Sequence, residues 1–400
     1  MERKHLIRLP PCPDYDIAGT ETWLADMAWE GWLLGESGFF CGLAFFDRAE
    51  PQEMTYRLAA ALRPTGMLTE NGGEPDREEK ALNAACGWEY VGNRGQFYVY
   101  RTPGRAGREL HTDPAVQALA VEAVRKRQKG SLFTTVFWAI LYPLAHMKFA
   151  VVYTAIALGL GLSLLWAAFL LAGVGGSLWR TFYYGRLKRR LGGGEDLEHH
   201  KDWRRDRRFY RVRQGAWWLL LALVIGLSVN TFHRADESKI PIAEDTGTVP
   251  FATLADLAGG GVENYEAVLP RYNTVFRWSN ALAETVEWNE SATMTRSDGT
   301  PFSGGLDVDY HELATEWMAR RLVEEYYRKD KGGLTRRDGF QDLSLPDLGL
   351  DEARAYVGIF PTVVLRQGNK VLRAVHYETG PEESRLTLEE WAGLLAESIR

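Results

Sequence analysis

The sequence predicts an α+β protein whose two folded domains are joined by membrane-spanning helices. Two observations predict this architecture. Residues 1–115 and 234–400 combine short aromatic or alternating apolar runs with helical patterns, whereas residues 131–179 contain one Lys, Lys148, no Arg and no acid. A single helix through residues 131–179 would be roughly 70 Å long, about twice the hydrocarbon thickness of a bilayer. The chain must therefore turn inside this run.

The N-terminal domain, residues 1–115, mixes strand and helix patterns. The expected elements are a strand at Lys4–Leu9, a helix at Thr20–Trp32, strands at Trp32–Leu34, Phe39–Asp47 and Met54–Leu62, a helix at Pro75–Cys86 and a hairpin at Gly87–Arg101. Taken as β-α-β-β-α-β, this order is typical of a ferredoxin-like α+β sandwich, in which two helices cover one sheet.

A set of spaced residues in this domain resembles a bacterial, Gram-positive family, the domain of unknown function 2812. The residues that carry the resemblance are Tyr15-Asp16, Trp23-Leu24, Gly31-Trp32, Phe45-Phe46, Tyr56-Arg57, Gly87-Trp88-Glu89 and Glu109-Leu110-His111-Thr112-Asp113. The resemblance covers roughly residues 5–115. Many members carry membrane spans, so it implies a regulatory or envelope context, and it supplies no catalytic residues.

Four residues of this domain are candidate partner or ligand contacts: Trp32, Tyr56, Arg57 and Trp88. Core packing is the favoured interpretation of the three aromatics, because large rings at strand and helix spacing fill small α+β cores. Arg57 follows Tyr56 on an expected strand, and a solvent-facing position is favoured for it over a binding role.

Three apolar runs are predicted to span a membrane, at Ser131–His146, Ala150–Gly173 and Ala216–Phe232. Pro143–Phe149 supplies the turn between the first two. The predicted plan is a cytoplasmic domain at 1–115, a basic juxtamembrane helix at 116–130, a transmembrane hairpin at 131–178, a basic loop at 179–214, a third span at 215–232 and an extracytoplasmic α+β domain at 233–400.

The segment from Arg180 to Arg213 predicts the orientation. It contains twelve Lys or Arg residues and five acids, against one Lys at the tip of the hairpin. Cationic loops beside spans stay on the cytoplasmic side. We therefore expect a multi-pass protein of the bacterial plasma membrane, with a cytoplasmic N-terminus and an extracytoplasmic C-terminus. The three cysteines then lie in the reducing cytoplasm, where no disulfide is expected.

The same segment supplies candidate contacts for anionic lipid headgroups. These are Arg186, Lys188, Arg189, Arg190, Arg204, Arg205, Arg207 and Arg208. A purely orienting and solvating role is the favoured alternative, and nucleic acid is not an expected partner. His199 and His200 are expected to be solvated, because two adjacent histidines lack further spaced ligands.

The C-terminal domain carries a net charge of −11 over residues 234–400. A helix is predicted at Asp309–Arg328, with Asp309 and Glu312 at its N-terminal cap and a buried stripe of Leu313, Trp317, Met318, Leu322 and Tyr326. A hairpin is expected at Thr362–Arg366 and Lys370–Tyr377, and a helix at Thr387–Ile399. Asp307 and His311 belong to the densest group of acid/base residues, but helix capping explains their neighbours.

No catalytic, cofactor-binding or metal-ligating set is expected from these patterns. The preferred interpretation is a non-enzymatic membrane protein that links an outer domain to an inner, partner-binding domain, in envelope sensing, regulation or scaffolding. The alternatives are a membrane-anchored extracytoplasmic enzyme, which would use Asp307 and His311, and an accessory subunit of a transporter. The expected partners are the bilayer and an unidentified cytoplasmic protein, and a homo-oligomer is left open.

Overall fold

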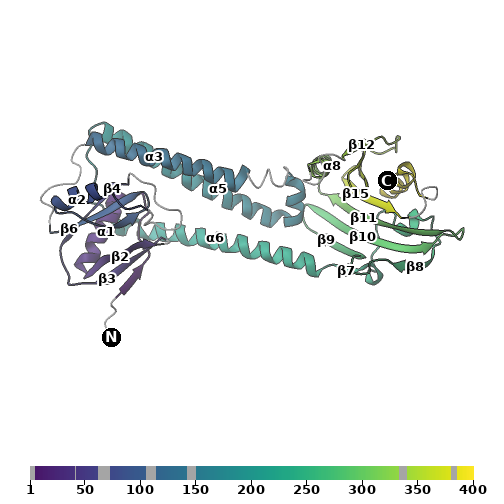
Figure 1. Cartoon of the computed structure of the whole chain (residues 1–400), viewed down its shortest axis with the longest axis horizontal. Helices are drawn as coiled ribbons and strands as arrows, with labels where there is room; N and C mark the ends of the chain where they lie inside the picture. The colour runs from purple at the N-terminus through teal and green to yellow at the C-terminus, as the bar shows by residue number, and fades with distance from the viewer. Residues whose placement is uncertain are drawn as a thin grey trace. The chain divides into compact units, whose positions relative to one another are not determined.

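The computed structural model is a mixed α/β structure that divides into two compact units. One unit contains residues 1–138 and 170–221, and the other contains residues 139–169 and 222–400. The structure describes residues 5–40, 42–61, 73–104, 114–141, 150–332, 340–379 and 385–400. Each unit is considered in turn below, and the labels are those of Figure 1.

The N-terminal unit contains two copies of one arrangement of strands and a helix. Its elements are β1 (His5–Arg8), α1 (Ile17–Trp29), β2 (Trp32–Phe40) and β3 (Leu43–Arg48), followed by β4 (Met54–Ala60), α2 (Arg77–Ala85), β5 (Glu89–Arg94) and β6 (Phe97–Pro103). The strands form two antiparallel three-stranded sheets, ordered β1-β3-β2 and β4-β6-β5. Each half is therefore a βαββ unit in which the last strand lies in the middle of its sheet.

The ferredoxin-like arrangement with one sheet is wrong, because the strands pair within each half. The expected strand at Phe39–Asp47 is in fact interrupted by a turn at Gly42, where φ is 75°. This turn creates the β2–β3 hairpin, so the first half completes its own sheet before β4 begins. The expected elements themselves are present, from β1 through the β5–β6 hairpin.

Helix α1 anchors the core of this unit. Asp16 caps its N-terminus by accepting a hydrogen bond from the Gly19 amide at 3.1 Å. Trp23 and Leu24 are buried beneath the sheets. The same core includes Tyr184, Leu191 and Trp203 from the long helices that follow. The N-terminal domain is therefore incomplete without residues far beyond position 115.

The long helices are α3 (Pro114–Val136), which continues into a π-helical turn at Phe137–Leu141, α5 (Val151–Gly192) and α6 (Trp203–Glu237). Figure 1 labels these helices. Among the described residues, α5 and α6 are long and apolar enough to cross a membrane. The first expected span, Ser131–His146, is helical as far as Leu141, and its remainder lies outside the described residues. The expected basic loop is mostly helix, because α5 continues to Gly192 and α6 begins at Trp203.

Helix α5 is broken near its start. Gly159 has φ 75° and ψ 163°, so residues 151–158 form a separate helical segment. Within it, Val152 and Ile156 are buried in the C-terminal unit. The Asn280 side chain donates a hydrogen bond to the Ile156 carbonyl at 2.9 Å, which satisfies an acceptor that the break leaves without its helical partner. The beginning of the expected second span therefore belongs to a folded core.

The C-terminal unit is built on one sheet with helices on both faces. Its strands are β7 (Ile240–Pro241), β8 (Glu263–Ala267), β9 (Thr274–Ser279), β10 (Ala283–Thr295), β11 (Pro301–Leu313), β12 (Gln341–Leu343), β13 (Glu352–Val357), β14 (Pro361–Gln367) and β15 (Lys370–Glu378). The sheet order is β12-β13-β14-β15-β11-β10-β9-β7, and β8 also pairs with β10.

Alternate residues of each strand serve different cores. Val363 and Leu365 of β14 face the core that contains α7 (Leu254–Leu257) and α9 (Leu388–Ile399), whereas Val364 faces α8 (Glu316–Lys331). This is the period of two that a strand requires when both faces of its sheet are covered. The expected hairpin at residues 362–377 and the closing helix are both present.

The helix expected at Asp309–Arg328 begins later than predicted. Residues 301–313 form β11, and α8 starts at Glu316 with Thr315 as its cap, which accepts a hydrogen bond from the Met318 amide. Leu306, Val308 and Tyr310 alternate toward the core, and this alternation outweighs the local capping pattern. Leu322 and Tyr326 are buried as expected, but Trp317 is exposed.

Glu325 of α8 caps the first turn of α5. Its two carboxylate oxygens accept hydrogen bonds from the Val152 amide at 3.1 Å and the Tyr153 amide at 2.9 Å, and its side chain is 1% exposed. We predict that Glu325→Gln lowers the free energy of unfolding of the C-terminal unit by about 1–3 kcal/mol, because one amide loses a charged acceptor and meets an NH2 group.

Thermal unfolding of the full chain and hydrogen exchange at the Val152 and Tyr153 amides measure this effect. Glu324→Gln is the matched control, because Glu324 makes partly exposed ion pairs with Arg328 and Arg354. Equal stability of the two variants would contradict the capping role of Glu325.

Candidate functional site

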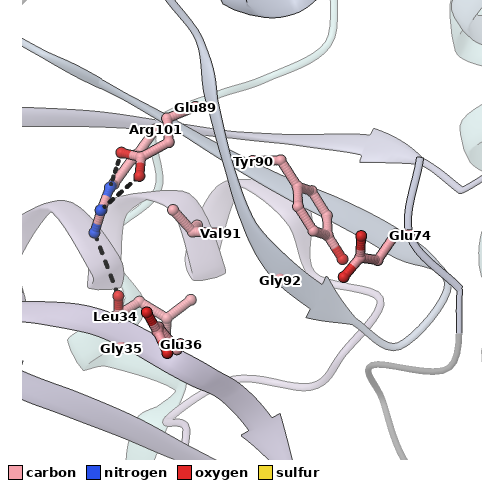
Figure 2. A pocket seen from close by; sticks show the side chains of 9 residues that line it. All are labelled: Leu34, Gly35, Glu36, Glu74, Glu89, Tyr90, Val91, Gly92 and Arg101. Carbon is pink, nitrogen blue, oxygen red and sulfur yellow. Dashed lines mark hydrogen bonds and ion pairs between the residues drawn. The ribbon is translucent and has the colours of Figure 1, made fainter. Parts of the chain in front are cut away.

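A pocket opens between the two halves of the N-terminal unit. β2 and β5, the equivalent edge strands of the two sheets, lie against each other without forming a ladder. A cavity of about 260 Å³ is lined there by Leu34, Gly35, Glu36, Glu74, Glu89, Tyr90, Val91, Gly92 and Arg101 (Figure 2). Both strands depart from regular pairing here, with register shifts between Leu34 and Phe39 and between Tyr90 and Gly92. The irregular edges make room for the cavity.

Arg101 joins the two halves of the N-terminal unit beside this cavity. Its Nε and Nη2 donate to the Glu89 carboxylate at 2.7 and 3.0 Å, and its Nη1 donates to the Leu34 carbonyl at 3.3 Å (Figure 2). Glu36 and Glu74 add two carboxylates to the lining, so the cavity walls are net negative. Burial, reinforced by Glu74, raises the pKa of Tyr90. The cavity therefore suits a small ligand with hydrogen-bond donors, and the described residues that line it include no Ser, Cys or His.

The four residues predicted as contacts do not form one site, and none of them lines this cavity. The Arg48 guanidinium lies 5.0 Å from the ring of Trp32. Tyr56 and Trp88 are almost fully buried in two separate clusters, as core packing predicts. Arg57 is not solvent-facing: its side chain is 17% exposed and lies 3.6 Å from the Glu21 carboxylate.

Sequence reasoning missed Arg101 and the three glutamates of the pocket. One signal could have found part of this site. Glu89 and Arg101 are direct cross-strand partners in the β5–β6 hairpin, and opposite charges at such positions pair. The packing of β2 against β5 corresponds to no pattern in the local sequence.

The connection between α5 and α6, residues 193–202, docks on α1. Lys201 Nζ lies 2.8 Å from an Asp16 carboxylate oxygen, and Trp203 Nε1 donates to Asp26 at 2.9 Å. His199 Nδ1 lies 2.8 Å from Glu21 Oε2. The expectation that His199 is solvated is therefore wrong. Its partner Glu21 lies 178 positions away in the chain, so the residues around His199 do not reveal the contact.

Glu21 is the polar centre of this docking site. Its side chain is 2% exposed, and its Oε1 accepts a hydrogen bond from the Leu58 amide of β4 at 2.7 Å. Burial raises the pKa of Glu21, while hydrogen bonds from His199 and Leu58 and the charge of Arg57 oppose that shift. One carboxylate of the first half thus contacts the second half and the α5–α6 connection.

Six of the eight predicted lipid contacts fall into two groups, and the other two, Arg205 and Arg208, are exposed on α6. Lys188 pairs with Glu122, Arg204 pairs with Asp26, and the guanidinium of Arg207 lies over the Trp203 ring. These side chains are held by the N-terminal unit. Arg186, Arg189 and Arg190 instead line an open groove on α5, together with Phe182 and Glu195.

In the C-terminal unit, the expected acid/base residues are held by internal partners. His311 Nδ1 lies 2.9 Å from the Thr285 hydroxyl, and its Nε2 lies 2.6 Å from the Tyr326 hydroxyl. Arg373 bridges Asp309 at 3.1 Å and Asp330 at 2.9 Å. Asp307 shares this face of β11, where burial and Asp309 raise its pKa. No group of three His, Cys, Asp or Glu that could hold a metal occurs among the described residues.

The fold and these sites define a two-unit α/β protein, and the residues that the structure describes include two helices long and apolar enough to cross a membrane. Residues 16–134 match a family model that is described as protein of unknown function (DUF2812). This segment, which runs from the cap of α1 nearly to the end of α3, belongs to that family, and the predicted resemblance is confirmed. Comparison with the curated proteins gave no match, and comparison with the solved structures gave none.

The raised pKa of Glu21 predicts a pH-dependent stability. The Glu21 carboxyl binds its proton more tightly in the folded unit than in the unfolded chain. Its contribution to the free energy of unfolding is therefore full below pH 4.5 and is lost as the pH rises through the raised pKa. Glu21→Gln cannot ionise. The free energy of unfolding of this variant, minus that of the parent, should therefore increase from pH 4.5 to about pH 8.

Urea unfolding of the full chain at several pH values, followed at Leu58 by hydrogen exchange, measures the difference. Glu30→Gln, at the exposed end of α1, is the matched control. A difference that decreases with pH would mean that the ion pair with His199 outweighs the burial of the carboxylate.

Burial lowers the pKa of His311 from 6.5 to about 4. Between these values the unfolded chain binds a proton that the folded unit excludes, so stability is lost as the pH falls. We predict that the C-terminal unit loses about 3 kcal/mol from this source between pH 6.5 and pH 4, and that His311→Gln removes the loss. Hydrogen exchange of β10 and β11 in the full chain measures it, and an unchanged pH profile in the variant would contradict the assignment.

Proposed function

We propose that this protein is a non-enzymatic protein of the bacterial plasma membrane that links an extracytoplasmic sensing or scaffolding domain to a cytoplasmic, partner-binding domain. The observation that carries the proposal is the sharing of helix α5 by two cores. Its first residues are buried in the C-terminal unit, and its last residues are buried in the N-terminal unit. A movement of residues 151–158 acts, through the break at Gly159, on the helix that runs on to Gly192.

The attachment in the C-terminal unit depends on packing and on charge. Val152 and Ile156 pack against α8, and the Tyr153 ring lies 5.8 Å from the Tyr326 ring. The ammonium of Lys329 lies 4.0 Å from the Tyr153 ring. With the cap supplied by Glu325, these contacts hold both the backbone and the side chains of the first turns.

The attachment in the N-terminal unit is equally extensive. Tyr184 and Leu191 are 1% and 2% exposed within the core that contains α1. The Tyr183 ring lies 4.8 Å from the Tyr15 ring. The α5–α6 connection then docks on α1 through Lys201. A shift of the long helices therefore acts on α1.

Charge and length support the proposed topology. Between the break at Gly159 and Arg180, residues 160–179 carry no charge, and at 1.5 Å per residue they span roughly 30 Å, the hydrocarbon thickness of a bilayer. The cationic segment from Arg180 onward favours the cytoplasmic side for the N-terminal unit. With a first span that begins at Ser131, the chain crosses three times and ends outside.

The anchored-enzyme alternative would use Asp307 and His311. The contacts of His311 and Arg373 with neighbouring side chains favour a structural role for that cluster. Nothing specific favours a transporter subunit, so the linking role is the one we retain.

Reporter fusions test the topology. An alkaline phosphatase reporter placed after residue 400 should be active, because this enzyme matures only outside the cytoplasm. The same reporter placed in the 193–202 connection should be inactive. An inactive C-terminal fusion would overturn the proposed orientation.

Hydrogen exchange on the full chain in nanodiscs tests the link. Glu325→Gln should increase exchange in α1 and in residues 193–203, although the substitution lies in the other unit, because α5 transmits the loosened attachment. Glu324→Gln should leave both segments unchanged. Changes that stay within the C-terminal unit would contradict the linking role.

The partner search should use the full chain as bait. A fragment of residues 1–115 lacks Tyr184, Leu191 and Trp203, which complete the core of the domain. Crosslinking in cells should capture a cytosolic protein on the N-terminal unit. Capture of membrane or outer proteins alone would count against a cytoplasmic partner-binding domain.

A further inference from the structure

One face of α5 carries an aromatic residue followed by arginines. Phe182, Arg186, Arg189 and Arg190 are spaced four, three and one residues apart, so they lie on one side of the helix. Together with Glu195, they line a groove of about 400 Å³. This set of four residues is called the cationic stripe below. The opposite side of α5, which carries Tyr184 and Leu191, packs in the core of the N-terminal unit.

The cationic stripe has an excess of positive charge. Arg190 Nε donates to Glu195 at 2.6 Å, but Arg186 and Arg189 make no ion pair with an acid in the described part of the chain. Other cations nearby are paired, such as Arg180 with Asp14 at 3.5 Å and Lys188 with Glu122 at 3.3 Å. Two guanidinium groups are therefore available to an external anion.

The stripe adjoins the end of the apolar run. Trp179 and Phe182 are each 56% exposed, with ring centroids 6.1 Å apart. Aromatic side chains in this position typically mark the headgroup level of a bilayer. Arg186 lies seven residues beyond Trp179, or about 10 Å along the axis. Because helical side chains lean toward the N-terminus of their helix, the arginines lean back toward Trp179.

We propose that the cationic stripe binds one anionic phospholipid, such as phosphatidylglycerol, in the leaflet beside the N-terminal unit. The guanidinium groups of Arg186 and Arg189 hold the phosphate, since a planar fork of N–H donors matches its oxygens. Phe182 and Trp179 lie along the beginning of an acyl chain. The inference rests on the proposed membrane span of α5.

A lipid, rather than a soluble phosphate, is the occupant that fits this groove. The groove is continuous with exposed apolar side chains, and Leu178 beside Trp179 is 51% exposed. A soluble phosphate would contact only the arginines and leave these rings in water. The shared phosphate chemistry makes the two sources separable only by experiment.

Native mass spectrometry of the full chain in detergent, titrated with phosphatidylglycerol, tests the proposal. We expect Arg186→Gln/Arg189→Gln to weaken binding of phosphatidylglycerol by roughly tenfold or more and to leave binding of phosphatidylcholine unchanged. The matched control is Arg211→Gln/Arg213→Gln on α6, which removes the same charge from an exposed surface outside the groove. We expect the control to retain the affinity of the parent.

Three results would overturn the proposal. Equal losses in the two double variants would mean that only general charge attracts the lipid. Undiminished binding in the Arg186→Gln/Arg189→Gln variant would remove the site. Competition by glycerol phosphate as effective as that of the lipid would identify a soluble phosphate as the ligand. Lipid binding in detergent is independent of orientation, so failure of the reporter or exchange experiments leaves this test intact.

Discussion

Helix α5 passes through three environments along a single length. It begins among the buried side chains of the C-terminal unit, continues as an exposed apolar run, and ends in the core of the N-terminal unit. The helix meets a different structural requirement in each environment. Glu325 satisfies the amides of the first turn, Gly159 separates the docked segment from the apolar run, and Arg189 and Arg190 complement the carbonyl end. The core of neither unit is complete without this helix.

Buried charge defines where the helices meet the N-terminal unit. A carboxylate as buried as Glu21 is tolerated only with partners, and those partners come from two elements: Arg57 and Leu58 on β4, and His199 in the connection after α5. Removing any of them leaves the buried carboxylate short of a hydrogen bond or an ion pair. This requirement gives the docking site its specificity, because an apolar contact could slide along α1 whereas a paired carboxylate cannot. The two halves of the unit are joined in the same way by Arg101.

Local patterns in the chain were sufficient for many elements. The helical pattern at Thr387–Ile399 correctly indicates α9, and the alternation through Val363, Leu365 and Val371 indicates the β14–β15 hairpin. The same method failed at Asp309 and Glu312, which look like a helix start but lie in the middle of β11. Neighbouring strands β10 and β15 pair with both sides of that segment. Their hydrogen bonds outweigh a local preference of about 1 kcal/mol.

Composition and short-range pattern were enough to predict an α+β protein, the apolar runs, the excess of cations after Trp179 and the resemblance of the N-terminal segment to its family. These properties are local, so neighbouring residues suffice to reveal them. The duplication of the βαββ half, the cavity between β2 and β5, the pairing of His199 with Glu21 and the capping of α5 by Glu325 came only from the folded chain. Each joins residues far apart in the sequence, and hydrogen-bond geometry at that separation leaves no periodic signal along the chain.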